Sequence, residues 1–568
     1  MDVKGEQDEY DVVVVGAGFG GPVAARKCAE AGLKTLMLER GEKAGEKVIS
    51  GLTIPFYGFL FGPQFIRDGN PPVERPVDGI INYIIRDIET GDIDIDDSLK
   101  IPKPLSPVLA FGYNAYCQPF CEWEAEKAVE SGAEFRTSTA VTGVTKENGR
   151  VTGIVTDGGE RIGSKIIIDA EGSQGLLAIS AGVREKYTPD VISLADVYDY
   201  EMSKEDVDRI FGHSIRFCWG WDEQGLAPPL GYGNGLMVWP YRGSIHWIQD
   251  ECVRISDGRT PNLVKDFEGY HRSITSQLPW WREKVAPRVS LRAHMFDTFE
   301  IYVGLDEKLR NMPNHTDGMI LIGDAAGLES TALCDGVPAA WFSADIAADV
   351  AIEALKAGDT SASFLKKYDD SIKAHPVIQW SITSRERHDL RLAQASHDEQ
   401  ELKRCVHNGW GLGGFNHMST PLVRIILDSI AEDPSIIASW ILMYCRYYYN
   451  WTHERFDGKS GRAEVVPVMQ TAGQRVFTKT FEITDRVLER LDAPIKSLAS
   501  LLAHLSPAAN PMMKTLLPLI EPVYCFLIRF LEPLTDPLSR KLVEFVENAD
   551  PAIFDVAKRK GDRDEKSL

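Results

Sequence analysis

Three glycines near the start of the chain have the spacing of a site that binds nucleotide phosphates. Gly16, Gly18 and Gly21 form the pattern G-x-G-x-x-G, and Glu39 follows 18 residues after the last of them. In this pattern the first glycine permits a tight turn, the second lets the backbone approach a pyrophosphate, and the third allows close helix–strand packing. A carboxylate at that distance can accept hydrogen bonds from ribose hydroxyls.

The elements around these glycines are those that such a site needs. Residues 11–15 are a β-branched run, which is typical of a strand buried on both faces of a parallel sheet. An alanine-rich helix is predicted over residues 23–31, and a second strand over residues 34–38 leads directly to Glu39. The N-terminus of the helix would offer free N–H groups to the phosphates. Together they predict a dinucleotide site, but the pattern alone does not distinguish FAD from NAD.

A second motif lies far along the chain and bears on the choice of cofactor. Residues 317–324 are a predicted buried strand ending in Gly-Asp, and residues 336–355 begin with Gly-Val-Pro and continue as an alanine-rich helix. This segment resembles the second flavin motif of the glutathione-reductase-type FAD enzymes, in which the aspartate holds the ribityl chain. The resemblance implies that FAD is the cofactor and that Asp324 lies beside its ribityl or pyrophosphate region.

Other segments resemble the branch of these enzymes that contains geranylgeranyl reductases, FixC proteins and electron-transfer flavoprotein–quinone oxidoreductases. The segments are residues 39–41 and 47–51, the helix over residues 120–128, and residues 292–294. The resemblance extends over roughly residues 8–400. It implies that the cofactor is held by Gly16, Ala17, Gly18, Phe19, Gly20, Gly21, Glu39, Arg40, Ser50, Gly51, Cys117, Val141, Gly323, Asp324, Gly336 and Val337.

The chain also departs from this branch. Cys117 and Cys121 stand where an arginine and an aspartate are expected, and the reductases' Tyr-x-Trp-x-Phe-Pro signature is absent, which argues against an isoprenoid double bond as the substrate. The two cysteines could be packing residues or a redox pair. No group of cysteines has the close spacing that iron–sulfur ligation requires, so we expect no metal and FAD as the only redox centre.

These patterns predict an α/β protein. It would contain a glutathione-reductase-type, Rossmann-like FAD domain with a parallel sheet and a three-stranded meander, then a β-sheet substrate domain and an α-helical C-terminal extension. The meander strands are predicted at residues 140–146, 150–156 and 164–169, separated by Asn-Gly and Asp-Gly-Gly turns. The expected boundaries are residues 8–183 and 290–375 for the discontinuous FAD domain, 184–289 for the substrate or cap domain, and 376–568 for the extension.

The expected substrate domain carries two histidines that could act in catalysis. His246 and His294 could deliver protons to a reduced substrate, although a lone histidine is more often structural. Several tryptophans fall in the same part of the chain. They could line a pocket for a planar or lipidic ligand, or they could be ordinary core aromatics.

Composition excludes some classes of protein. The 568 residues include 62 Lys+Arg and 83 Asp+Glu, a formal net charge of −21, which argues against a nucleic-acid partner. The chain has only 9 cysteines and a polar, acidic start without an apolar signal segment, so we expect a cytoplasmic location. No run of about 18 uncharged apolar residues is present, so we expect no spanning helix.

Two roles are open for the C-terminal part of the chain. Residues 516–534 are apolar but are broken by prolines and charges, so they could form an amphipathic anchor at the inner face of the membrane or the core of a partner-docking domain. Overall we expect an FAD-dependent oxidoreductase that passes electrons or hydride between a protein carrier, of the electron-transfer flavoprotein or ferredoxin type, and a quinone or unsaturated lipophilic substrate. An FAD monooxygenase that uses NAD(P)H and O₂ is the alternative, and a redox-sensing scaffold is a third hypothesis.

Overall fold

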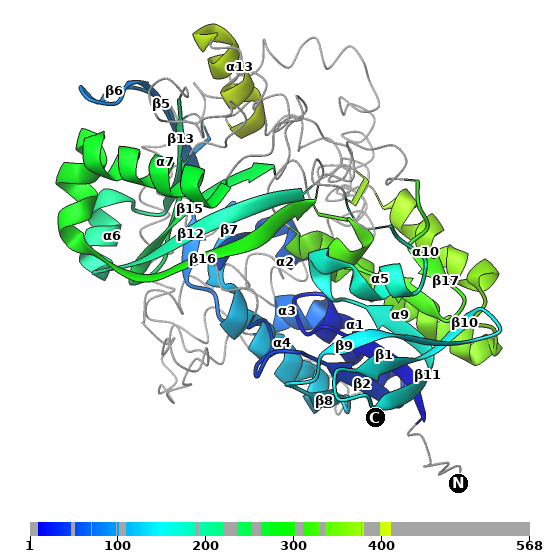
Figure 1. The fold of residues 1–568 in the computed structure, drawn as a ribbon. Coiled ribbons are helices and arrows are strands. Elements are labelled where there is room, and N and C mark those ends of the chain that lie inside the picture. Colours follow the sequence, from blue (N-terminus) through cyan, green and yellow to red (C-terminus); the bar gives the residue numbers. More distant parts are fainter. Residues whose placement is uncertain are drawn as a thin grey trace, which may run out of the picture.

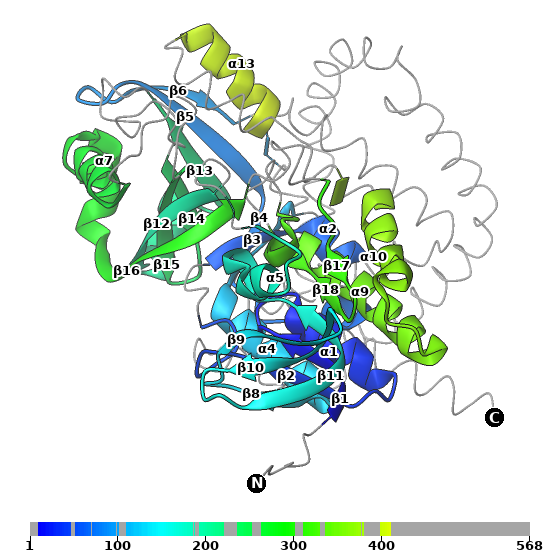
Figure 2. The same ribbon diagram turned by 45° about the vertical axis from the view of Figure 1, so that its right-hand side comes forward.

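A computed structural model of the chain contains three β-sheets, with eight, seven and three strands, and helices packed against them. The two larger sheets lie in separate parts of the molecule, as Figure 1 and Figure 2 show from two directions. The structure describes residues 9–46, 51–69, 71–97, 99–100, 110–185, 187, 192–220, 236–252, 263–301, 311–329, 336–375, 378–379 and 398–410.

The eight-stranded sheet is built around parallel strands in the order β18-β11-β1-β2-β8. The predicted β-branched strand is β1, whose Val12, Val13 and Val14 are completely buried. The short strand β17 (His315–Thr316) pairs antiparallel with β18. The bounds of the parallel strands are β1 (Glu9–Val15), β2 (Thr35–Leu38), β8 (Glu134–Arg136), β11 (Arg161–Asp169) and β18 (Met319–Leu321).

The predicted meander is present. β9 (Val141–Glu147) and β10 (Arg150–Thr156) form an antiparallel hairpin, and β10 pairs antiparallel with β11. Asn148 and Gly149 have φ angles of 50° and 86°, as a tight hairpin turn with two left-handed residues requires. β11 begins at Arg161, three residues earlier than predicted, and it belongs to the parallel sheet as well as to the meander.

Helices pack on the parallel sheet and enclose the first core. α1 (Gly21–Glu30) packs against α4 (Cys117–Glu130) and α9 (Val337–Ala357), and α10 (Ala362–Ala374) lies beside α9 (Figure 2). The rings of Phe19, Phe120 and Trp341 meet where α1, α4 and α9 converge, with centroids 5.7 to 6.3 Å apart. α5 (Leu176–Ser180) packs against β9 on the meander side.

The seven-stranded sheet, here the second sheet, has the order β16-β12-β15-β14-β13-β5-β6. Its strands come from a wider part of the chain than residues 184–289: β5 and β6 precede that range, and almost all of β16 follows it. β5 joins by pairing in parallel with β13, with Gly79 opposite Ser214. The bounds are β5 (Gly79–Asp87), β6 (Asp92–Asp96), β12 (Ile192–Met202), β13 (Ser214–Trp219), β14 (Leu236–Pro240), β15 (Ser244–Cys252) and β16 (Val289–Ile301).

Helices and a core flank each side of the second sheet. α7 (Leu263–Gln277) covers one face together with the short α6 (Lys204–Ile210), over a core that includes Tyr198, Trp247 and Trp281. The opposite face carries a core that includes Val197, Trp219 and Tyr241. α13 (Glu399–Trp410) packs against β5 (Figure 1).

The three-stranded sheet lies between the two larger ones (Figure 2). It has the order β3-β7-β4, with β3 (Gly51–Pro55), β7 (Gly112–Tyr116) and β4 (Arg75–Val77) all paired antiparallel. The chain continues from β3 into α2 (Phe56–Phe61) and α3 (Gln64–Asp68). Leu52 of β3 packs against both the first core and the core of the second sheet.

The expected C-terminal extension is described only in part. α13 falls within residues 376–568 and is helical, whereas residues 411–568, which include the apolar segment 516–534, lie outside the described residues. Within the described part of the chain, no helix combines the length and apolarity needed to cross a membrane.

Candidate functional site

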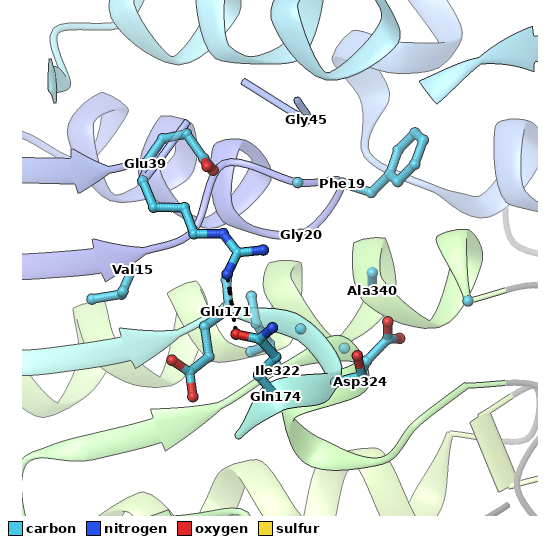
Figure 3. A pocket seen from close by; sticks show the side chains of 18 of the residues that line it. Val15, Phe19, Gly20, Glu39, Gly45, Glu171, Gln174, Ile322, Asp324 and Ala340 are labelled. Carbon is cyan, nitrogen blue, oxygen red and sulfur yellow. Dashed lines mark hydrogen bonds between the residues drawn. The ribbon is translucent and has the colours of Figure 1, made fainter. Parts of the chain in front are cut away.

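A cavity of about 460 Å³ lies at the edge of the parallel sheet where the strands reach their carboxyl ends (Figure 3). Val15, Leu38, Ala170 and Ile322 line it at or just after the ends of β1, β2, β11 and β18. The second sheet closes the cavity with side chains of β12 and β16. Ligands of open parallel sheets bind at this edge, so the position matches the site predicted from the two motifs.

The three glycines of the first motif occupy different surroundings. Gly16 has a φ of +105°, and a Cβ there would lie 2.3 Å from the carbonyl oxygen of Ala170. A Cβ on Gly21 would lie 1.9 Å from the carbonyl oxygen of Gly16, so the fold itself requires both glycines. A Cβ on Gly18 would meet no atom of the described residues within 4 Å. The space beside Gly18 therefore belongs to the cavity, as expected where a pyrophosphate approaches the backbone.

Glu39 ties the glycine loop to the end of β2. Its Oε2 accepts a hydrogen bond from the Ala17 N–H at 2.9 Å, and its Oε1 accepts one from the Gly41 N–H at 2.8 Å. The carboxylate is almost fully buried and lines the cavity. Because each carboxylate oxygen has two lone pairs, Glu39 can still accept hydrogen bonds from ribose hydroxyls.

Arg40 and Gln174 meet across the cavity. Arg40 Nη1 donates to Gln174 Oε1 at 3.1 Å, and this contact is the dashed line in Figure 3. Arg40 follows β2, whereas Gln174 ends the short 3₁₀ turn Gly172–Gln174 that follows β11. The two residues therefore join the loops that follow β2 and β11, the strands on either side of β1, at the same end of the cavity as Glu39.

The second motif forms the other wall. Gly323 has a φ of +55°, and its N–H donates to Ser343 Oγ at 3.0 Å, which holds the loop after β18 against α9. A Cβ on Gly336 would lie 3.0 Å from Asp324 Oδ1, so the glycine lets the start of α9 approach that carboxylate. The N–H groups of the first turn of a helix have no partner within the helix, so they suit a negatively charged or polar ligand group.

Asp169 stabilises the loop that follows β11 at the carboxyl edge of the parallel sheet. It is the last residue of β11, is completely buried, and its Oδ1 accepts a hydrogen bond from the Glu171 N–H at 3.1 Å. Burial raises the pKa of this carboxyl well above its usual range. Asp169 thus fixes the loop that carries Glu171 into the cavity.

Most of the residues predicted to hold the cofactor line this one cavity. Ala17 and Gly21 belong to the glycine loop but contact Glu39 and Gly16 instead, and Ser50 lies outside the described residues. Gly51 and Cys117, the first residues of β3 and α4, do not line the cavity themselves. The predicted residues that line the cavity are Gly16, Gly18, Phe19, Gly20, Glu39, Arg40, Val141, Gly323, Asp324, Gly336 and Val337.

The sequence prediction missed several residues of the lining. Glu171 and Gln174 could have been found, because they follow β11, another strand of the predicted parallel sheet. Ala195, Val197 and Met295 carry no signal of this kind, since their place depends on how the second sheet packs over the first. The other lining residues that were missed include Gly45, Leu52, Thr139, Leu176, Glu329 and Ala340.

The two cysteines of α4 are packing residues in this structure. Cys117 and Cys121 are buried and not disulfide-bonded, and burial raises the pKa of Cys121 well above its usual range. The side chain of Cys121 packs against Gly45, where a Cβ would lie 2.6 Å from it. Among the described residues, no group of His, Cys, Asp and Glu side chains is arranged to hold a metal ion.

Neither histidine of the expected substrate domain lines the cavity. His294 neighbours Met295 on β16 and points to the opposite face, where its Nε2 lies 2.6 Å from Asp196 Oδ1 and its ring stacks on Tyr198 at 4.0 Å. His246 is completely buried on β15, and its Nδ1 accepts a hydrogen bond from the Gly51 N–H at 3.1 Å.

Comparisons with known proteins agree with this architecture. Residues 11–191 match the family described as FAD dependent oxidoreductase. The digeranylgeranylglycerophospholipid reductase of Methanocaldococcus jannaschii is 28% identical over 367 residues, which cover 64% of this chain and 82% of that protein. The FixC protein of Azorhizobium caulinodans is 27% identical over 349 residues, covering 60% of this chain and 75% of FixC.

The fold is also found among solved structures. A geranylgeranyl bacteriochlorophyll reductase-like protein from Thermoplasma acidophilum superposes with a TM-score of 0.53 at 21% identity, covering 71% of this chain and 97% of that one. The comparisons therefore confirm the cofactor and the branch of flavoproteins that the two motifs indicated. The chain is an FAD-dependent oxidoreductase, distantly related to the geranylgeranyl reductases and to FixC.

Proposed function

We propose that this oxidoreductase passes electrons or hydride between a protein electron carrier and a quinone or unsaturated lipophilic substrate. The proposal rests on the chemistry of the cavity roof, which is the part of the lining formed by the second sheet and β3. The second sheet contributes Ala195, Val197 and Met295 to the cavity, and Leu52 joins them from β3. This roof offers apolar contacts and no titratable side chain, which suits a lipophilic molecule better than a charged one.

The remaining walls would hold the cofactor. FAD, when bound, supplies the hydride- and electron-transfer chemistry. The glycine loop at Gly18 and the N-terminus of α1 would bind its pyrophosphate, Glu39 its adenosine ribose, and Asp324 its ribityl chain. In this arrangement the apolar roof would exclude water from the flavin end of the cavity, so that a lipophilic acceptor does not compete with solvent there.

The sequence supports a protein carrier rather than a nicotinamide as the electron donor. A second G-x-G-x-x-G occurs at residues 409–414, but its first glycine lies in the last turn of helix α13 and not after a strand, so it lacks the context of a nucleotide site. The relatives' names add support for the acceptor, because four of the matching proteins are named as reductases of a phospholipid.

The proposal can be tested with the pure, FAD-loaded enzyme under anaerobic conditions. We expect NADH and NADPH to bleach the flavin absorption only slowly, and a short-chain quinone to reoxidise the dithionite-reduced enzyme rapidly. A monooxygenase would show the reverse pattern: rapid bleaching by NAD(P)H, and reoxidation by O₂ that depends on an organic substrate. That pattern would overturn the proposal.

The roof can be tested in the same assay. Val197→Asp places a charge on the apolar roof, and should slow reoxidation by the quinone while FAD remains bound. Tyr198→Phe, the neighbouring residue on the opposite face of β12, is the matched control and should leave the rate unchanged. Equal rates in wild type and Val197→Asp would show that the quinone does not meet this surface.

A further inference from the structure

A chain of polar side chains joins the small sheet to the second sheet just outside the cavity. Arg292 of β16 donates to the Tyr116 hydroxyl at 2.8 Å and to Asp199 Oδ2 at 2.7 Å. The other oxygen of Asp199 lies 3.3 Å from His246 Nε2. His246 Nδ1 then accepts the hydrogen bond from Gly51 N–H at 3.1 Å. The chain therefore begins at a half-exposed arginine and ends on a backbone N–H of β3.

These contacts define the state of His246. Because Gly51 N–H donates to Nδ1, that nitrogen carries no proton, and the ring proton lies on Nε2, facing Asp199. Burial lowers the pKa of His246 and favours the same neutral form. His246 therefore has no proton to give at Nδ1, and its Nε2 faces a carboxylate in the interior of the protein and not the cavity.

The residue that His246 holds is next to the cavity wall. Gly51 is the first residue of β3, and Leu52, which follows it, lines the cavity. Gly51 also packs so tightly on Tyr241 that a Cβ would lie 2.3 Å from the tyrosine hydroxyl. The start of β3 thus packs closely against the second sheet. The hydrogen bond to His246 fixes the position of the Gly51 backbone relative to that sheet.

We propose that His246 is a positioning residue that fixes the start of β3, and with it Leu52 in the roof of the cofactor cavity, through its hydrogen bond from Gly51 N–H. This role replaces the expectation that His246 delivers protons. The inference rests on the FAD assignment and not on the identity of the substrate.

Two substitutions at this position separate the hydrogen bond from the imidazole ring. In His246→Asn the amide oxygen can take the place of Nδ1 and accept from Gly51 N–H, whereas His246→Ala leaves that N–H buried without a partner. We expect His246→Ala to weaken FAD binding about tenfold and to shift the absorption bands of the bound flavin. We expect His246→Asn to stay within about twofold of the wild-type dissociation constant.

Hydrogen exchange at Gly51 provides a readout that is independent of activity. The Gly51 N–H should exchange slowly in the wild type and in His246→Asn, and much faster in His246→Ala. If His246→Ala does not fold, rapid exchange in the folded His246→Asn protein would overturn the proposal, and slow exchange would support it.

His294→Asn is the matched control, because it makes the same change on β16, another strand of the second sheet, without touching β3. It should leave FAD affinity, the flavin bands and Gly51 exchange unchanged. Wild-type affinity and slow Gly51 exchange in His246→Ala, or equal defects in His294→Asn, would overturn the positioning role. A protein that meets these expectations but does not reduce quinones would refute the proposed function alone.

Discussion

Gly18→Ala should weaken FAD binding without weakening the fold. The φ of Gly18 is outside the left-handed region, and an added Cβ would meet no atom of the described residues within 4 Å. The methyl group would therefore stand in the cavity, and the free energy of unfolding of the apoprotein should change by no more than about 0.5 kcal/mol. Forcing one methyl group against a bound pyrophosphate should cost about 1–3 kcal/mol, or roughly 5- to 150-fold in the dissociation constant.

Gly21→Ala, in the same motif, should instead weaken the fold of the apoprotein. Its Cβ would lie 1.9 Å from the carbonyl oxygen of Gly16, a backbone atom that cannot move without disturbing the turn. We expect the apoprotein to lose at least about 1–3 kcal/mol of unfolding free energy. Urea unfolding of the apoproteins and titration of flavin fluorescence measure the two effects separately. Wild-type FAD affinity in Gly18→Ala, or wild-type stability of the Gly21→Ala apoprotein, would refute this account of the glycine loop.

Three further predictions concern buried polar groups. Glu124 accepts a hydrogen bond from Trp341 Nε1 at 2.6 Å, and burial raises its pKa well above the usual range. Its protonated form therefore favours the folded state, and the free energy of unfolding should fall as the pH rises from the ordinary value of 4.5 through that raised pKa. Glu124→Gln should flatten this fall in a series of urea unfolding curves, and an unchanged slope would contradict the assignment. Cys117 and Cys121 are buried, so a thiol reagent followed by peptide mapping should label them only in unfolded protein, and rapid labelling of the native protein would argue for a redox role. The Tyr241 hydroxyl is buried and has no partner in the described part of the chain, so Tyr241→Phe should leave the unfolding free energy unchanged or raise it; a loss of more than about 1 kcal/mol would reveal a partner.

Features that depend on neighbouring residues could be predicted from the sequence. The strand before Gly16, the helix after Gly21 and the Asn148-Gly149 turn each follow from a local requirement for buried β-branched residues, close packing or a left-handed backbone. The approach of Asp324 to the first motif could also be predicted. It follows from the resemblance and from the rule that parallel strands gather their carboxyl ends at one edge.

Features that depend on pairing between distant segments could not be predicted. A strand pattern shows that β5 is extended, but it does not show that its neighbour is β13. For the same reason the apolar roof at Val197 and Met295 had no signal, because its position requires the second sheet to be placed over the first. The hydrogen bond from the Gly51 N–H to His246 could not be predicted either, since the two residues lie 195 positions apart in the chain.

The parallel pairing of β5 with β13 has a consequence for the order in which the nascent chain can fold. β5 cannot pair until β13 has been synthesised, because Gly79 lies opposite Ser214. At roughly 5–20 residues per second a ribosome needs on the order of ten seconds to add the chain between these two residues. During that interval β5 and β6 form at most an isolated hairpin, which is marginally stable in water. β18 and α9, which carry the second wall of the cavity, are synthesised later still. The cofactor therefore cannot be captured early in translation, and the growing polypeptide must keep the apolar strand β5 from aggregating until β13 has left the ribosome.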